Sequence, residues 1–121
     1  MTLAEKQQKF SLLVARLILW TYGHDYKVTL GEAYRTPEQA AWNARHGSGI
    51  KNSLHTEKLA IDLNLFIKNK ITGVYEYKDD TESYKLLGDY WKTLDPDCCW
   101  GGDFKGRKDG NHFSLTHNGI K

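Results

Sequence analysis

The sequence predicts a single small α+β domain in which three helices pack on a mostly antiparallel sheet. The chain has 121 residues, enough for one hydrophobic core, and 40% hydrophobic with 26% charged residues is typical of a soluble globular protein. Three segments carry helix signals, over 2–23, 36–47 and 80–94. Four others have strand character, over 27–34, 59–67, 98–104 and 111–115. We therefore expect one domain, 1–121.

The first helix should begin after Thr2, because Thr2 and Glu5 have the spacing of a capping box. Its apolar residues recur at helical spacing: Phe10, Leu13, Val14, Leu17 and Ile18. It should end near 22–23. Arg16 interrupts the apolar run over 11–20, and that run is far shorter than the roughly 20 residues of a membrane span. We expect an amphipathic core helix and no stable membrane insertion.

The second helix has both a start and a stop signal. Thr36 suits the N-cap, Pro37 suits the first helical position, and Gln39 has the spacing that completes a capping box. Gly47 should stop the helix. A glycine-containing loop is expected over 47–52.

The strand over 59–67 should have two different faces, because successive side chains of a strand point to opposite sides. The apolar face carries Leu59, Ile61, Leu63 and Leu65. The other face carries Ala60, Asp62 and Asn64. A turn should follow at 68–73.

The last third of the chain is predicted to hold one helix and two short strands. The helix over 80–94 has a buried stripe made of Tyr84, Leu87, Trp91 and Leu94. Pro96 lies just beyond its end. A glycine-rich, charged loop should join the strands over 98–104 and 111–115.

Charge and cysteine content exclude several classes of protein. Seventeen Lys and Arg against 15 Asp and Glu give a net charge of +2, too small to indicate nucleic acid binding. Cys98 and Cys99 are adjacent, so we expect free thiols rather than a disulfide or a metal site. The first residues lack the pattern of a signal peptide, so synthesis in the cytoplasm is expected. A monomer is also expected.

His55 and Asp62 form the first candidate metal site. If residues 56–58 turn the chain, His55 can fold back towards Asp62, and small Ala60 leaves room between them. A neutral imidazole and a carboxylate suit Zn²⁺. On this spacing alone, a solvated strand face remains an alternative.

A second cluster strengthens the metal hypothesis. Asp109-Gly-Asn is a turn signal, and His112 enters the next strand directly after it. A catalytic zinc site has three protein ligands and one open position. His55, Asp62 and His112 supply three ligands, and Asp109 is then a spare carboxylate for base catalysis.

Two further residues could meet a substrate. Arg35 lies where a strand gives way to a helix, and its permanent charge suits an oxyanion or a carboxylate; an ion-paired surface arginine is the alternative. Trp100 adjoins Gly101 and Gly102 and could line a cleft, although core packing is the commoner role for tryptophan.

Taken together, these elements resemble the zinc peptidases of the D-alanyl-D-alanine carboxypeptidase and L-alanyl-D-glutamate endopeptidase group, which includes many phage endolysins. The group's signature is Ser-x-His-x6-Asp followed later by an acidic residue three positions before a histidine. Here these are Ser53-Leu-His55 to Asp62, and Asp109-Gly-Asn-His112. The segments YRTPEQA, GSGIKNSLH and WGGDF are also similar. The family often has glycine five residues after the serine, where this chain has Lys58.

The resemblance implies a zinc peptidase catalytic domain of the fold shared with hedgehog proteins, and a role for each matching residue. The zinc ligands would be His55, Asp62 and His112, holding one Zn²⁺ per chain. Asp109 would take a proton from the attacking water and pass it to the departing amine. Arg35 would stabilise the oxyanion or hold a substrate carboxylate, and Ser53 and Gln39 would contact the substrate.

The predicted function is hydrolysis of the stem peptides of bacterial peptidoglycan, as a phage or prophage lysis enzyme that reaches the cell wall after release from the cytoplasm. The bond is either L-alanyl-D-glutamate or D-alanyl-D-alanine. Two alternatives remain open: a non-catalytic zinc-containing module that binds the cell wall, and a small metal-dependent nuclease, which DGNH superficially resembles.

Overall fold

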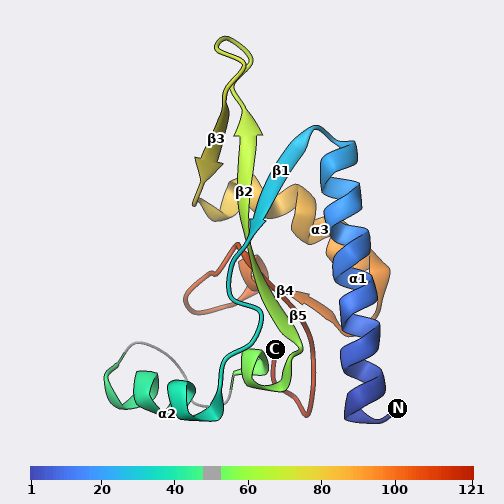
Figure 1. Ribbon diagram of the computed structural model, residues 1–121, viewed down its shortest axis with the longest axis vertical. Coiled ribbons are helices and arrows are strands. Elements are labelled where there is room, and N and C mark those ends of the chain that lie inside the picture. The colour runs from blue at the N-terminus through green and yellow to red at the C-terminus, as the bar shows by residue number, and fades with distance from the viewer. Residues whose placement is uncertain (48–52) are drawn as a thin grey trace.

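The computed structural model describes residues 1–47 and 53–121 and shows a twisted sheet flanked by helices (Figure 1). Its helices are α1 (Leu3–Gly23), α2 (Pro37–Arg45) and α3 (Lys85–Leu94), with three short 3-10 helices, η1 (Leu54–Glu57), η2 (Thr81–Tyr84) and η3 (Gly101–Asp103). Its strands are β1 (Tyr26–Leu30), β2 (Ala60–Lys68), β3 (Tyr75–Lys78), β4 (Cys98–Trp100) and β5 (His112–Leu115). All observed pairings are antiparallel, so the predicted α+β fold is confirmed. The loop expected over 47–52 lies, beyond residue 47, outside the described residues.

The long strand β2 organises the sheet. Its later residues pair with β1 and β3, and its first three residues pair with β5, which in turn pairs with β4. The strand order is therefore β1-β2-β5-β4, with β3 also on β2. The register sets Asp62 of β2 directly opposite His112 of β5.

The apolar face of β2 packs against α1 and α3 in one core. Leu63 and Leu65 of this face are fully buried, as is Leu59 just before the strand. The helices contribute Phe10, Leu13, Val14 and Leu17 from α1, and Leu87 and Trp91 from α3. The Trp91 indole also donates to the carbonyl oxygens of Cys99 and Ser114, which ties α3 to the last two strands. The polar face of β2 is left for the site.

The helices mostly follow the sequence signals. Thr2 and Glu5 form the complete capping box of α1. Thr36 caps α2, but the Gln39 side chain donates to Asn43 at 2.6 Å instead of returning to the cap, so this box is incomplete. The third predicted helix is η2 followed by α3, because its first turn is a 3-10 helix. Within the described ranges, no helix is long and apolar enough to span a bilayer.

The strands differ from the predictions in three places. The strand expected over 98–104 ends at Trp100, because residues 101–103 form the 3-10 helix η3. The strand expected over 27–34 ends at Leu30, although the next residues still bond to β2: the Gly31 N–H donates to the Asp62 carbonyl at 2.8 Å, and the Asp62 N–H donates to the Glu32 carbonyl at 2.9 Å. β3 was not predicted. It completes a hairpin with β2 after Gly73, whose φ of 75° requires the left-handed region that glycine adopts easily.

Candidate metal centre

A short turn folds His55 back onto β2. The Ser53 hydroxyl caps η1 by accepting from the His55 N–H at 3.2 Å. Lys58 then takes a left-handed conformation, with φ 58° and ψ 35°, and the chain enters β2. His55 Nε2 consequently lies 3.4 Å from Asp62 Oδ1, as the proposed turn over 56–58 requires.

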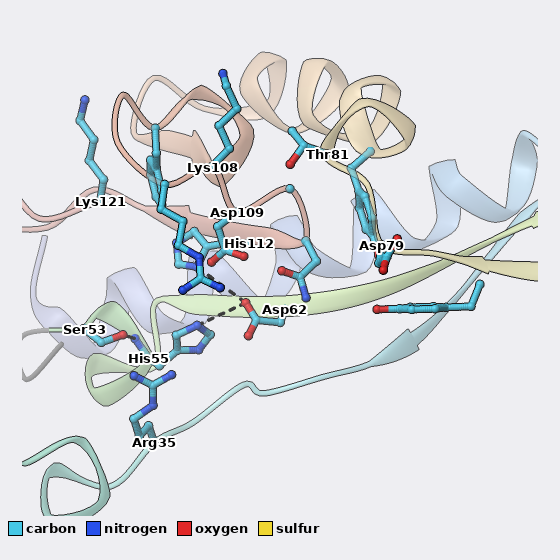
Figure 2. Close-up of a pocket in the computed structure, with 16 residues that line it drawn as sticks. Arg35, Ser53, His55, Asp62, Asp79, Thr81, Lys108, Asp109, His112 and Lys121 are labelled. Carbon is cyan, nitrogen blue, oxygen red and sulfur yellow. Dashed lines mark hydrogen bonds and ion pairs between the residues drawn. The ribbon is translucent and has the colours of Figure 1, made fainter. Parts of the chain in front are cut away.

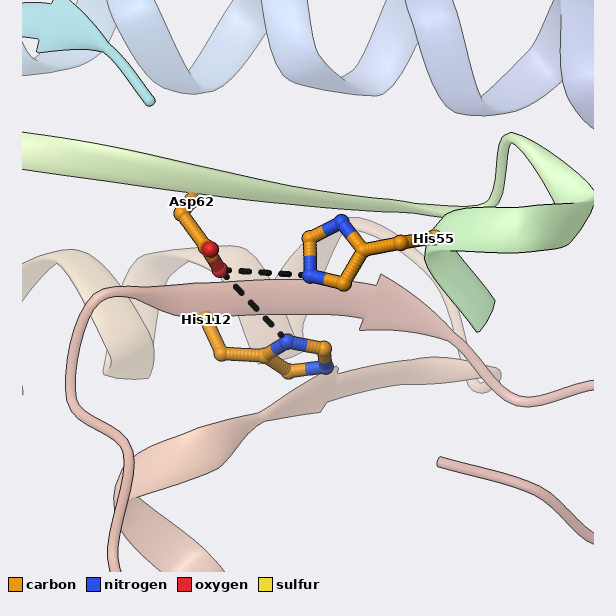
Figure 3. A group of neighbouring side chains, drawn as sticks. All are labelled: His55, Asp62 and His112. Carbon is orange, nitrogen blue, oxygen red and sulfur yellow. Dashed lines mark ion pairs between the residues drawn. The ribbon is translucent and has the colours of Figure 1, made fainter. Parts of the chain in front are cut away.

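β5 brings the second histidine to the same oxygen atom. His112 stands opposite Asp62 in the sheet, and its Nδ1 lies 3.7 Å from Asp62 Oδ1. One possible ligand atom from each of His55, Asp62 and His112 lies within 4.8 Å of the others (Figure 3). The backbone thus brings together three side chains whose ligand atoms are of the kind that bind zinc.

The chemistry of these donors fits a divalent cation. The side chains of His55 and His112 are 5% and 7% exposed. The buried Oδ1 of Asp62 has no hydrogen-bond partner among the described residues, which is costly unless a cation compensates it. Burial raises the pKa of the Asp62 carboxyl, but the two imidazoles that face it, His112 and His55, outweigh burial and lower that pKa to about 2. Asp62 is therefore ionised at any ordinary working pH.

The donors open onto a cleft of about 560 Å³ (Figure 2). Asp109, Arg35 and Ser53 also line it, so the structure brings these predicted residues to one place. Asp109 is fixed relative to His112, because its carbonyl accepts from the His112 N–H at 3.1 Å. Its side chain is exposed to the cleft, which leaves the carboxylate accessible to water and substrate.

Arg35 is held beside the first histidine. The backbone N–H of Arg35 donates to the His55 carbonyl at 3.1 Å, and the Arg35 guanidinium is ion-paired with Glu32. Glu32 was missed by the sequence reasoning. The signal that could have found it is a carboxylate placed next to a strand end, three residues before a candidate arginine.

Two predicted substrate residues lie elsewhere. Gln39 is exposed on α2 and bonded to Asn43, and it lines a separate surface hollow. Trp100 is only 5% exposed, and its indole donates to the Gly110 carbonyl at 2.7 Å. Trp100 therefore does not line this cleft, and its buried ring has the core-packing role that was the alternative.

The cleft also has cationic residues that the sequence reasoning did not single out. Arg107, Lys108 and Lys121 join Arg35 along its lining. Asp79 lies at the opposite end of the cleft from Lys121 (Figure 2). The lining thus has a positive side, which would attract an anionic peptide, and a negative end, which would repel it.

Two histidines, one aspartate and a separate carboxylate at an open cleft are the donor set of a hydrolytic metal enzyme. Comparison with family models matches residues 46–115 to the D-alanyl-D-alanine carboxypeptidase family. The match covers more than half of the chain, and the protein belongs to this family of peptidases that act on peptidoglycan. His55, Asp62, Asp109 and His112 lie within the matched range, whereas Arg35 lies before it.

The fold agrees with a solved structure of a peptidase. The crystal structure of the Serratia marcescens L-Ala D-Glu endopeptidase ChiX matches with a TM-score of 0.59 and 24% sequence identity, over 74% of this chain and 67% of that chain. Among curated proteins, no match was found. The structural likeness supports the fold, and the family match carries the peptidase assignment.

Proposed function

We propose that this protein is a zinc-dependent peptidase that hydrolyses a peptide bond in the stem peptides of peptidoglycan. The observation that carries the proposal is the convergence of His55, Asp62 and His112 at a cleft that Asp109 also lines. Family membership supplies the reaction class. The three converging side chains would hold the zinc ion.

A zinc ion bound there would lower the pKa of a water molecule and polarise the scissile carbonyl. Asp109 accepts a proton from the attacking water and delivers it to the amine nitrogen as the C–N bond breaks. Arg35 faces the same cleft and stabilises negative charge on the carbonyl oxygen or holds a substrate carboxylate. Ser53 holds the His55 turn in place and reaches the cleft, so it can also contact the substrate.

The cleft lining fits an anionic substrate. Both candidate bonds lie beside a carboxylate, since a terminal D-alanine carries one and a D-glutamyl residue carries one. Arg35, Arg107 and Lys108 offer positive charge on the lining. The L-alanyl-D-glutamate and D-alanyl-D-alanine bonds are both kept in the proposal, and digestion of muropeptides with mass spectrometry decides between them.

Metal analysis and peptidoglycan digestion test the proposal. Protein purified without added zinc should contain about one zinc per chain and release new amino groups from peptidoglycan. Asp109→Ala should retain zinc but lose activity by about 100-fold or more, in the range of general acid–base catalysis. Asp103→Ala is the matched control, because this exposed aspartate in the same loop pairs with Lys92 and does not line the cleft. Full activity in Asp109→Ala would refute the assignment.

The same experiment separates the alternatives. Zinc binding without release of amino groups would indicate a cell-wall-binding module. Nicking of plasmid DNA in the presence of Mg²⁺ or Zn²⁺ would indicate a nuclease, which family membership does not favour.

A role in lysis is the last part of the proposal. We infer a phage or prophage enzyme that is made in the cytoplasm and acts on the cell wall after release. Clearing of permeabilised Gram-negative cells by the purified protein supports this role. Cleavage of isolated muropeptides without any clearing argues against it.

A further inference from the structure

The segment after β1 is clamped to the metal centre by its backbone. The backbone of Asp62 accepts a hydrogen bond from the Gly31 N–H and donates one to the Glu32 carbonyl. The backbone N–H of Arg35 donates to the His55 carbonyl. The approach is close: a Cβ atom at Gly31 would lie 2.9 Å from the Asp62 carbonyl oxygen. Glu32 is therefore held beside two of the three proposed ligands.

One oxygen of Glu32 faces two functional side chains. Glu32 Oε1 is paired with Arg35 Nη2 and lies 3.6 Å from His55 Nδ1. His55 Nδ1 is buried and has no partner within hydrogen-bond distance in the described residues. The Glu32 carboxylate is the acceptor that these residues offer to it.

We propose that Glu32 is a positioning residue for both the zinc ligand His55 and the guanidinium of Arg35. This inference rests on the proposed zinc peptidase function. A neutral imidazole has one N–H and one lone pair, so a proton held on Nδ1 by Glu32 leaves the lone pair of Nε2 for the metal. Nε2 is the ring nitrogen that faces Asp62, at 3.4 Å.

The shared oxygen couples metal binding to substrate binding. A carboxylate beside the outer nitrogen of a ligand histidine raises the basicity of that ligand and fixes the ring orientation. The same carboxylate pairs with Arg35 and holds its planar head group at the cleft. Removal of the Glu32 charge should therefore weaken zinc binding and raise the KM for the peptide.

Glu32→Gln tests the proposal, because it removes the charge while keeping nearly the same shape. Zinc affinity is measured by competition with a chromophoric chelator, and we expect it to fall about 10- to 100-fold. Glu38→Gln is the matched control: Glu38 is exposed on α2 and does not line the metal cleft, so its zinc affinity should equal that of the parent. Circular dichroism and thermal melting in chelator should show that each variant is folded.

Arg35→Ala separates the two roles. If Glu32 served only to hold the arginine, Glu32→Gln would leave zinc affinity within threefold of the parent, and the proposal would be overturned. We expect instead that Arg35→Ala retains parental zinc affinity while its KM rises. Failure of the parent protein to bind zinc at all would refute the proposed function itself, a result distinct from equal binding by parent and Glu32→Gln.

A measurement on the parent protein avoids any folding defect of the variants. Long-range ¹H–¹⁵N spectra of zinc-loaded protein report which imidazole nitrogen carries the proton. We expect the His55 proton on Nδ1. A proton on Nε2 with Nδ1 bound to zinc would overturn the proposal.

Discussion

At the scale of single residues, Lys58 shows a conflict between side chain and backbone. Lys58 ends η1 in the left-handed region, φ 58°, at the position where the resemblance places glycine. That conformation costs a residue with a Cβ about 1–2 kcal/mol, whereas glycine adopts it freely. A cation–π contact offsets part of this cost, because the Lys58 ammonium lies 5.1 Å from the centre of the Tyr34 ring.

Lys58→Gly should therefore stabilise the metal-free protein by about 0.5–1 kcal/mol, after allowance for the greater freedom of glycine in the unfolded chain. Lys58→Ala is the control, because it removes the ammonium but keeps the Cβ, and it should destabilise slightly. Urea denaturation followed by circular dichroism gives the free energy of unfolding of each variant and so ranks their stabilities. An alanine variant more stable than the glycine variant would contradict the argument.

Cys98 should be an inert thiol. Burial raises the pKa of the Cys98 thiol to about 12, and the residue is 7% exposed. At pH 8 only roughly one thiol in ten thousand would be ionised, and the thiolate is the species that reacts. In Cys99→Ser protein, iodoacetamide at pH 8 should leave Cys98 unmodified for hours and alkylate it rapidly in 6 M urea, as peptide mass spectrometry would show. Rapid alkylation of the native protein would contradict its burial.

At the scale of elements, η3 sets the distance between the two ends of the cleft loop. The Asp109 N–H donates to the Gly101 carbonyl at 2.9 Å, and a Cβ at Gly101 would lie 2.0 Å from the Asp109 carbonyl oxygen and 2.9 Å from His112 Cβ. Gly101→Ala must therefore displace both functional residues. We expect a loss of about 1–3 kcal/mol in stability together with weaker zinc binding and lower activity.

Gly106→Ala is the matched control, because this glycine lies in the same loop and an added Cβ meets no atom within 4 Å. It should leave stability and zinc binding close to those of the parent. Equal behaviour of the two variants in thermal melting would show that the close approach at Gly101 does not support the site.

The elements also show what a sequence can predict. Local signals sufficed where one segment determines its own structure, as in the capping box at Thr2 and the alternating faces of β2. They failed where the outcome depends on distant partners. Trp100 was a candidate cleft residue because of its glycine neighbours, but the ring is buried, and Gly102 and Gly88 make room for it. Glu32 reaches the site because Gly31 and Glu32 bond to Asp62 of β2, a contact that the spacing of Glu32 from Arg35 does not by itself predict.

At the scale of the whole molecule, charge is distributed unevenly although the net charge is only +2. Positive side chains gather along the cleft, and three of them stand in the last fifteen residues or so of the chain, far in sequence from Arg35. The fold therefore gathers positive charge along one side of the cleft, which the overall composition does not reveal. Gathered charge of this kind raises the local concentration of an anionic substrate, and its effect weakens with salt.

Arg107→Gln tests whether this positive charge serves the substrate. Arg107 lines the cleft but is not one of the proposed metal ligands. With an anionic stem peptide, we expect Arg107→Gln to raise KM about three- to tenfold at low salt with little change in kcat, and to reduce the fall of kcat/KM between 0.05 and 0.5 M salt. Lys105→Gln is the control, because Lys105 is exposed in the same loop but lines a different hollow, so it removes the same charge from the protein without removing it from the cleft. If both variants change KM and its salt dependence equally, net charge and not the cleft lining attracts the substrate; if neither does, binding rests on the metal centre and Arg35.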